Sequence, residues 1–122
     1  MSGDEKRITV RFFKTAAGGE PVRDWLLGLA AEDRKLIGED IKTVEFGWPI
    51  GMPTCRPLSG GLYEVRTNLR DRIARVLFCI EGETMVLLHG FIKKAQKAPK
   101  HDLDLALIRK REFQKKTRAK GK

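Results

Sequence analysis

The sequence predicts a single α+β domain, in which a small antiparallel sheet carries a helical hairpin on one face and is followed by a C-terminal helix. Three observations predict this fold class. The chain has 122 residues, which suits one domain and is too short for two. Hydrophobic residues make up 41% of it and charged residues 34%, enough to bury a core. The apolar residues follow strand or helix periods in the order β-α-α-β-β-β-α.

The first three elements follow from local periodicity. A strand is expected at residues 7–13, where apolar and polar side chains alternate. A helix follows, with Pro21 at its first position. Its apolar residues recur at helical spacing: Val22, Trp25, Leu26 and Leu29. A second helix is expected at residues 32–46, because Gly47 stands where a helix would stop, and the short link predicts a helical hairpin.

The middle of the chain predicts a loop and then a meander. Residues 48–61 hold three prolines and three glycines, so a long loop without regular structure is expected there. Three strands follow, at residues 62–66, 72–80 and 84–92. The short connections between these strands predict two hairpins in series, which make an antiparallel meander.

The last segment is basic and then helical. Residues 93–100 are expected to form a basic connection. A helix is expected to begin near His101 or Asp102 and to run to about Lys115. Asp102 and Asp104 are suited to the positive end of this helix.

The excess of positive charge lies in the last quarter of the chain. The formal charge is +9, yet residues 1–92 hold 13 basic and 13 acidic side chains, whereas residues 93–122 hold 12 and 3. Clustered cations are what phosphate binding requires, so a polyanion-binding surface is expected. Residues 1–114 are expected to form the domain and residues 115–122 a basic, flexible tail, for which a merely solvated extension is the alternative.

Several other classes of protein are not indicated. No apolar run approaches the roughly 20 residues that span a bilayer, and the first residues lack the apolar segment of a secretion signal. A cytoplasmic protein without a membrane partner is therefore expected. Cys55 and Cys79 have no CxxC spacing and lie far from His89 and His101 in sequence. Neither a zinc site nor a disulfide framework is expected, and no cofactor is indicated.

Two arginines in the predicted strands are the first candidates for a functional site. Arg66 ends one strand, and Arg75 interrupts an otherwise apolar row in the next, where such an arginine usually has an assigned partner. Basic residues then follow the last strand: Lys93, Lys94, Lys97 and Lys100. A meander brings the ends of its strands to the same edge, so these cations can meet the arginines unless a register slip separates them.

Cations without metal ligands favour phosphate chemistry. In RNA cleavage by the neighbouring 2′-hydroxyl, a base removes the hydroxyl proton, cations stabilise the charged phosphorane, and an acid protonates the departing 5′-oxygen. Arginine suits the middle role because its charge is permanent and its donors form a fixed fork. Lysine could be the base if neighbouring cations lower its pKa. Cations that only hold phosphates in position are the alternative.

Two histidines and a tyrosine are further candidates. His89 lies between Leu87 and Phe91, and alternation places these three side chains on one strand face. We expect His89 to be a hydrogen-bonded core or rim residue rather than a catalyst. His101 is the better acid–base candidate by position, with a helix N-cap role as the alternative. Tyr63 can stack on a base or pack on the sheet.

Several motifs, taken together, resemble the RelE/ParE toxin superfamily, and within it the HigB-like, phage-derived branch. They are residues 57–66 (PLSGGLYEVR), 72–78 (RIARVLF) and 87–94 (LLHGFIKK), then Lys97, Pro99 and a closing helix with Ala106 and Arg109. The resemblance covers about residues 7–113. It implies a ribosome-dependent mRNA endonuclease that acts without metal and is neutralised by a small antitoxin, commonly a helix-turn-helix protein.

The resemblance also implies residue roles. Arg66 and Arg75 match the phosphate-contacting arginines of the superfamily, and the lysines after the last strand match its basic stretch. The expected catalytic set is Arg66, Arg75, Lys93, Lys94 and His101. The expected RNA-binding set is Lys97, Lys100, Arg72 and Tyr63. The departure is the general acid: relatives place a tyrosine or histidine near the C-terminal end, but no tyrosine follows Tyr63 here. Either His101 or a lysine takes that role, or the activity is weak or absent.

Two other functions remain open at this point. The same fold can serve a ParE-like inhibitor of DNA gyrase, which needs no nuclease site. A basic surface can also bind nucleic acid without cutting it. The clustered lysines favour RNA over gyrase.

Overall fold

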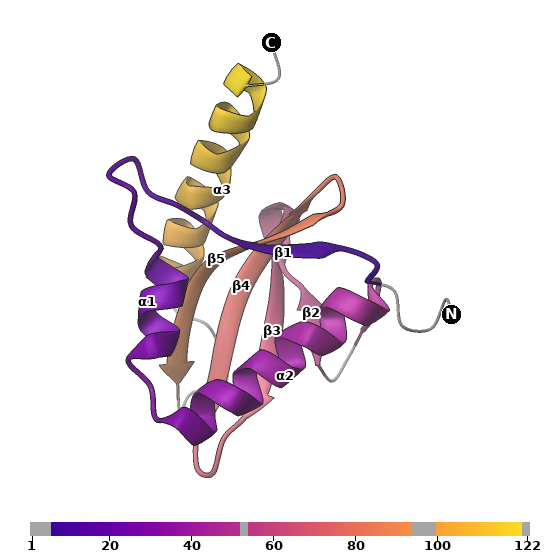
Figure 1. Cartoon of the computed structure of the whole chain (residues 1–122), viewed down its shortest axis with the longest axis vertical. Helices are drawn as coiled ribbons and strands as arrows, with labels where there is room; N and C mark the ends of the chain where they lie inside the picture. The colour runs from indigo at the N-terminus through magenta and orange to yellow at the C-terminus, as the bar shows by residue number, and fades with distance from the viewer. Residues whose placement is uncertain (1–5, 52–53, 94–99, 121–122) are drawn as a thin grey trace.

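The computed structural model of the chain describes residues 6–51, 54–93 and 100–120. In chain order, these residues form β1 (Thr9–Phe12), α1 (Pro21–Leu27), α2 (Ala31–Gly47), β2 (Cys55–Pro57), a 3-10 turn (Ser59–Gly61), β3 (Tyr63–Asn68), β4 (Ile73–Glu81), β5 (Thr84–Lys93) and α3 (Lys100–Lys120). The predicted α+β class and the order of the predicted elements are confirmed (Figure 1). No helix in this described part of the chain is long and apolar enough to cross a membrane.

The strands form one sheet in the order β1-β5-β4-β3-β2. From β2 to β5 each strand is antiparallel to the next, as predicted for the meander. β1 instead pairs parallel with β5, with Thr9 opposite Thr84 and Phe12 opposite Leu87. The predicted antiparallel sheet is therefore confirmed from β2 to β5, and the parallel pair of β1 with β5 departs from it. The long connection through two helices allows β1 to enter in the parallel direction, which alternation within a single strand does not specify.

The predicted loop at residues 48–61 contains regular structure. Cys55 pairs with Val65 of β3, and Pro57 pairs with Tyr63, so β2 forms the outer edge of the sheet. The expectation of no regular structure here is wrong, because an edge strand tolerates a proline whose missing N–H would face away from the ladder. The 3-10 turn follows, and its Gly60 has φ +73°.

The two faces of the sheet carry separate cores. The helices α1 and α2 cover one face, and α3 covers the other (Figure 1). The core under α1 and α2 includes Val22, Ile37, Ile41, Val44, Val65, Val76, Phe78 and Leu87. The core under α3 includes Phe13, Leu62, Leu77, Cys79, Val86, Leu88 and Ala106. A strand that is buried on both faces reads as a continuous apolar run, which explains the composition of β4 and β5.

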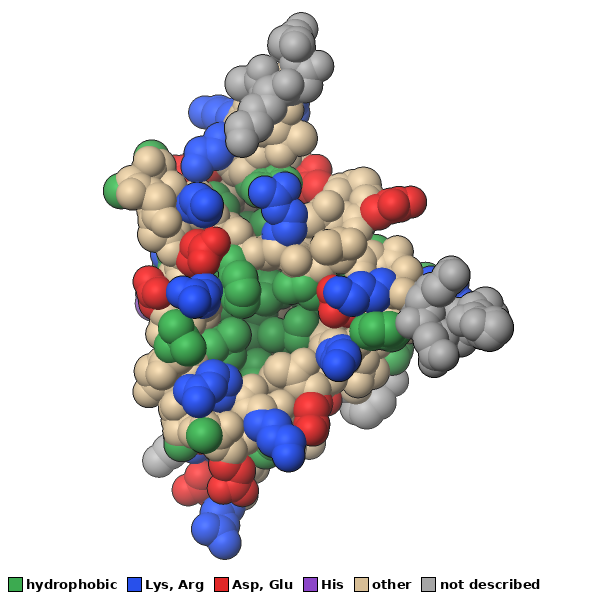
Figure 2. Space-filling view, in the orientation of Figure 1, with side chains coloured by type: hydrophobic (Ala, Val, Ile, Leu, Met, Phe, Trp, Pro, Cys, Tyr) green, Lys and Arg blue, Asp and Glu red, His purple; other side chains and the backbone are tan. Residues whose placement is uncertain are grey.

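The face under α1 and α2 is only partly covered. Figure 2 shows apolar side chains gathered between the two helices, with lysines and arginines around them. Trp25 of α1 packs so closely over Gly90 of β5 that a side chain at this glycine would clash with the indole ring. Helix α1 therefore packs on β5, and α2 packs on β3.

A β-bulge interrupts the pairing of β4 with β5. Leu77 pairs with His89 and Phe78 pairs with Leu87, so Leu88 is the extra residue. Leu87 packs in the core under α1 and α2, whereas Leu88 packs in the core under α3. The prediction that Leu87 and His89 share a face is therefore wrong, because the extra residue reverses the alternation between them.

Helix α3 is longer than predicted. It begins at Lys100 and continues past the predicted end near Lys115 to Lys120. Contacts made by its second half account for the extra turns. The Gln114 side chain donates a hydrogen bond of 2.9 Å to Glu81, and Lys116 Nζ donates one of 3.0 Å to the carbonyl of Lys14.

Candidate functional site

The face of the sheet under the start of α3 brings the two strand arginines together. Arg66 of β3 pairs with Arg75 of β4, and Arg75 pairs with Phe91 of β5. Directly paired residues in adjacent antiparallel strands project from the same face. We call this row, Arg66, Arg75 and Phe91, the arginine face. The two arginines are therefore neighbours across β3 and β4, as predicted.

Arg75 is fully buried and has an ionic partner, as expected for an arginine in an apolar row. Its Nη1 lies 3.1 Å from the Glu64 Oε2, and neither side chain has exposed surface. The second oxygen of Glu64 lies 3.8 Å from Nε of the half-exposed Arg56. Arg56 and Arg75 thus share one carboxylate, and the neighbouring Arg66 lies on the same face, so the local charge is positive. Arg75 supplies charge and rigidity from below, because its guanidinium does not reach the surface.

Arg66 is the surface cation of the arginine face. Its side chain is half-buried, and its guanidinium makes no hydrogen bond or ion pair with any residue that the structure describes. Its backbone is held by a hydrogen bond of 2.9 Å from its N–H to the carbonyl of Thr54. A fixed backbone with an uncommitted guanidinium is the arrangement that an anionic ligand requires.

His89 and Asp102 form a hydrogen-bonded pair beside the arginine face. His89 Nε2 lies 2.6 Å from Oδ1 of Asp102, in the first turn of α3. The imidazole ring stacks on Phe91, with ring centroids 5.4 Å apart. The expectation of a hydrogen-bonded rim histidine is confirmed.

His101 is the less constrained histidine. Its side chain is 81% exposed, and its Nε2 lies 3.9 Å from the same Asp102 oxygen. It lies within the helix that begins at Lys100, so the N-cap alternative is wrong.

Of the four predicted lysines, the structure describes the backbone of Lys93 and the whole of Lys100. The backbone of Lys93 pairs with Ile73 at the end of β5, two positions along the strand from the arginine face. Its side chain lies outside the described residues, as do Lys94 and Lys97 entirely. Lys100 is exposed and pairs with Asp104 at 3.1 Å.

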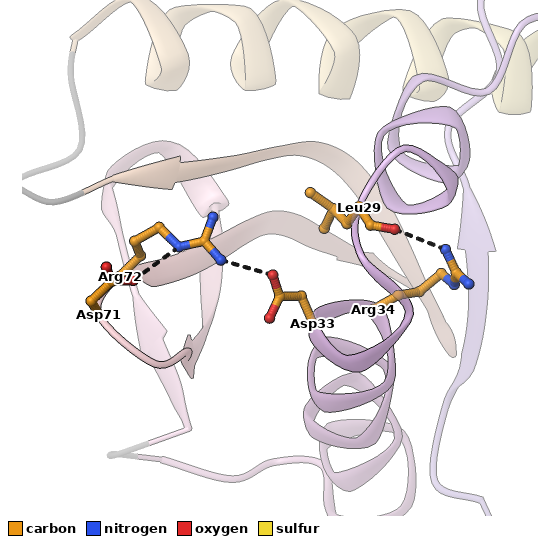
Figure 3. Close-up of polar contacts among 5 residues, drawn as sticks. All are labelled: Leu29, Asp33, Arg34, Asp71 and Arg72. Atoms are coloured by element: carbon orange, nitrogen blue, oxygen red, sulfur yellow. Dashed lines mark hydrogen bonds and ion pairs between the residues drawn. The ribbon is translucent and has the colours of Figure 1, made fainter.

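Two predicted RNA-binding residues lie elsewhere. Arg72, in the turn between β3 and β4, pairs with Asp33 of α2 at 2.8 Å and with Asp71 at 3.4 Å, as Figure 3 shows. Tyr63 packs in the core under α1 and α2, stacked on Phe78 at 5.5 Å with its edge against Trp48 at 5.0 Å. The structure does not bring Arg72 or Tyr63 to the arginine face.

Comparison with known proteins identifies the family. Residues 24–111 match the family described as Phage derived protein Gp49-like (DUF891). The chain belongs to the Gp49-like family. This family is one of the RelE/HigB-like toxins, so the chain is a toxin-like protein of the toxin–antitoxin type. The matched residues include the arginine face and the pair of His89 and Asp102. No curated protein matches the chain.

The cysteines of this Gp49-like protein are not suited to nucleophilic chemistry. Burial, together with the charge of Glu64, raises the pKa of Cys55 to about 11. Burial and the charge of Glu81 raise the pKa of Cys79 to about 12. The thiolate is the reactive form, and at neutral pH both groups stay protonated.

Sequence reasoning missed two carboxylates of this site in the Gp49-like protein. Glu64 shares the strand face of Arg66, so alternation along the strand could have identified it as the partner of Arg75. Asp102 could not have been assigned to His89 in this way. That contact depends on the β-bulge and on how α3 packs, and neither leaves a local pattern.

Proposed function

We propose that this Gp49-like protein is the toxin of a toxin–antitoxin pair, and that it cleaves mRNA on the ribosome through attack by the 2′-hydroxyl. One observation carries the proposal: Arg66 lies beside the buried Arg75 on one face of the sheet. The guanidinium of Arg66 makes no hydrogen bond or ion pair with the residues that the structure describes. The family supports the toxin class. The geometry supports the chemistry, because the phosphorane of this reaction needs fixed positive charge.

Arg66 and Arg75 have different roles in this proposal. Arg66 contacts the scissile phosphate from the surface and stabilises the charge that develops on its oxygens. Arg75 adds positive charge from beneath and is held by Glu64, so the face does not have to reorganise during the reaction. Further phosphate contacts are proposed for Lys93, Lys94 and Lys97. The proposed partners are the mRNA on the ribosome and a small antitoxin, which we expect to be a helix-turn-helix protein.

The test is cleavage during translation. The protein is added to a reconstituted translation reaction with a reporter mRNA, and the 5′ ends of the RNA are mapped with and without ribosomes. We expect ribosome-dependent cleavage that Arg66→Ala lowers by about 10²-fold or more, the size of effect of a lost oxyanion donor. The matched control is Arg23→Ala, an exposed arginine of α1 on the opposite face.

The same variants discriminate the alternatives. Growth arrest with intact mRNA and altered DNA supercoiling would exclude the nuclease and favour a gyrase inhibitor. RNA binding that depends on Arg66 but produces no cleavage in the translation reaction would favour a non-catalytic binding module.

A further inference from the structure

We propose that His89 is the general base of this reaction and that Asp102 positions it. The inference rests on the proposed function. It assigns the base, for which the sequence offered a lysine, to a histidine that the sequence analysis did not expect to be a catalyst. It is carried by a contact between two elements that lie apart in the chain. His89 Nε2, in β5, lies 2.6 Å from the carboxylate of Asp102, in α3.

The β-bulge turns His89 toward the site. Without the extra residue Leu88, alternation would place His89 in the core under α1 and α2 together with Leu87. With it, His89 pairs with Leu77 and lies on the α3 side, two positions along the strand from the arginine face. Bulges often re-aim a side chain beside an active site. Arg109 of α3 holds this one, because its Nη1 donates a hydrogen bond of 2.8 Å to the carbonyl of Leu88.

Asp102 selects the form of the imidazole that a base needs. Only 6% of Asp102 is exposed, so its carboxylate has little access to water and accepts the Nε2–H of His89. The proton-free nitrogen is then Nδ1, which makes no hydrogen bond with any described residue. This is the logic of a carboxylate that fixes the tautomer of a catalytic imidazole and stabilises the imidazolium.

His89 lies within reach of a phosphate bound at Arg66. The two residues project from the same face of β3 and β5. They are two strand spacings apart across the sheet, roughly 10 Å, and two residues apart along the strands, roughly 7 Å. An arginine side chain and a phosphate group together can bridge that gap. Phe91 lies in the row of Arg66, two residues along β5 from His89, and stacks on the imidazole, which fixes the plane of the ring.

The proposed step balances in protons and bonds. Nδ1 of His89 takes the proton of the 2′-hydroxyl while the 2′-oxygen bonds to phosphorus. The bond from phosphorus to the 5′-oxygen breaks, and a water molecule gives this oxygen its proton. The imidazolium returns a proton to the hydroxide that results, so the protein is regenerated. The products are a 2′,3′-cyclic phosphate and a 5′-hydroxyl.

His101 is a poorer base in this geometry. Its side chain is 81% exposed and 3.9 Å from Asp102, so no residue in the described part of the chain fixes its tautomer or its position. Among the residues that the structure describes, Arg75 and Glu64 lie on the same face of the sheet as His89 and are paired with each other. Neither is placed to take a proton, since Arg75 remains charged and Glu64 is buried in an ion pair.

The experiment compares three variants in the translation reaction: His89→Gln, Asp102→Asn and His101→Gln. Glutamine can keep a donor for Asp102, so His89→Gln preserves the contact that packs α3. We expect His89→Gln to lower the cleavage rate by about 10²- to 10⁴-fold, the usual contribution of a general base, with unchanged ribosome binding. Asp102→Asn should lower the cleavage rate by a smaller factor, because the imidazole remains. His101→Gln should keep most of the wild-type cleavage rate.

The pH profile separates a chemical role from a structural one. A general base acts in its proton-free form, so the wild-type rate should fall as the pH is lowered. The chain has two histidines, and His101→Gln leaves His89 as the single one. This variant should keep the pH dependence, and His89→Gln should lose it.

Each outcome has one meaning. If the wild-type protein does not cleave mRNA, the proposed function fails and the inference falls with it. If the wild type cleaves and a folded His89→Gln variant cleaves equally well, only the inference fails. Loss of the pH dependence in His101→Gln would overturn it as well, and this result does not depend on whether His89→Gln folds.

Discussion

At the scale of single residues, the most consequential contact is the buried ion pair of Arg75 and Glu64, 3.1 Å apart and without exposed surface. Arg75→Met leaves the carboxylate of Glu64 buried without its main partner. We expect this to lower the free energy of unfolding by about 3–5 kcal/mol, measured by urea denaturation. The double variant Arg75→Met/Glu64→Leu removes both charges and should recover most of the loss. A single variant as stable as the wild type would contradict this account.

The two buried cysteines predict how stability depends on alkaline pH. Burial raises the pKa of Cys55 to about 11 and that of Cys79 to about 12, from an ordinary value of 9.0. Above pH 9 the thiols of the unfolded chain ionise while those of the folded chain do not, so the free energy of unfolding should fall as the pH rises from 9 toward 11. Urea denaturation measures this fall, and the variant Cys55→Ala/Cys79→Ala should show less of it.

At the scale of secondary structure, the bulge in β5 and helix α3 depend on each other. Arg109 donates to the carbonyl of Leu88, the residue that the bulge leaves outside the ladder. Arg109→Met removes this donor, and we expect a loss of about 1–3 kcal/mol in the free energy of unfolding. Because the bulge aims His89, the cleavage rate should fall too. Arg111→Met, at an exposed position of the same helix, is the matched control and should change neither quantity.

The same elements show how far the sequence alone could predict the structure. Helices α1 and α2 and strands β3, β4 and β5 were predictable, because each has a hydrophobic period within its own residues. The parallel pairing of β1, the edge strand β2 and the bulge were not, because each depends on a partner distant in sequence. The site divides in the same way. The strand patterns placed Arg66 and Arg75 on neighbouring strands, but no local pattern links His89 to Asp102.

For the whole molecule, the net charge of +9 does not show where RNA would bind. The excess lies in residues 93–122, yet Lys100 is paired with Asp104, and Lys115, Lys116 and Arg118 are exposed side chains far along α3. The arginine face lies in the part of the chain that is neutral overall. Its positive character comes from Arg66 together with Arg56 and Arg75, the two arginines that share the carboxylate of Glu64, so position matters more than composition.

The salt dependence of RNA binding tests that location. A protein that neutralises phosphates releases counterions, and for single-stranded nucleic acid the slope of log K against log salt concentration is about −0.7 per phosphate contact. If Arg66 contacts one phosphate, Arg66→Ala should weaken binding and reduce the magnitude of this slope by about 0.7. Fluorescence anisotropy of a labelled single-stranded RNA measures both quantities. Arg23→Ala, on the opposite face, removes the same formal charge and should leave the slope nearly unchanged; equal slope changes in both variants would show that net charge rather than the arginine face holds the RNA.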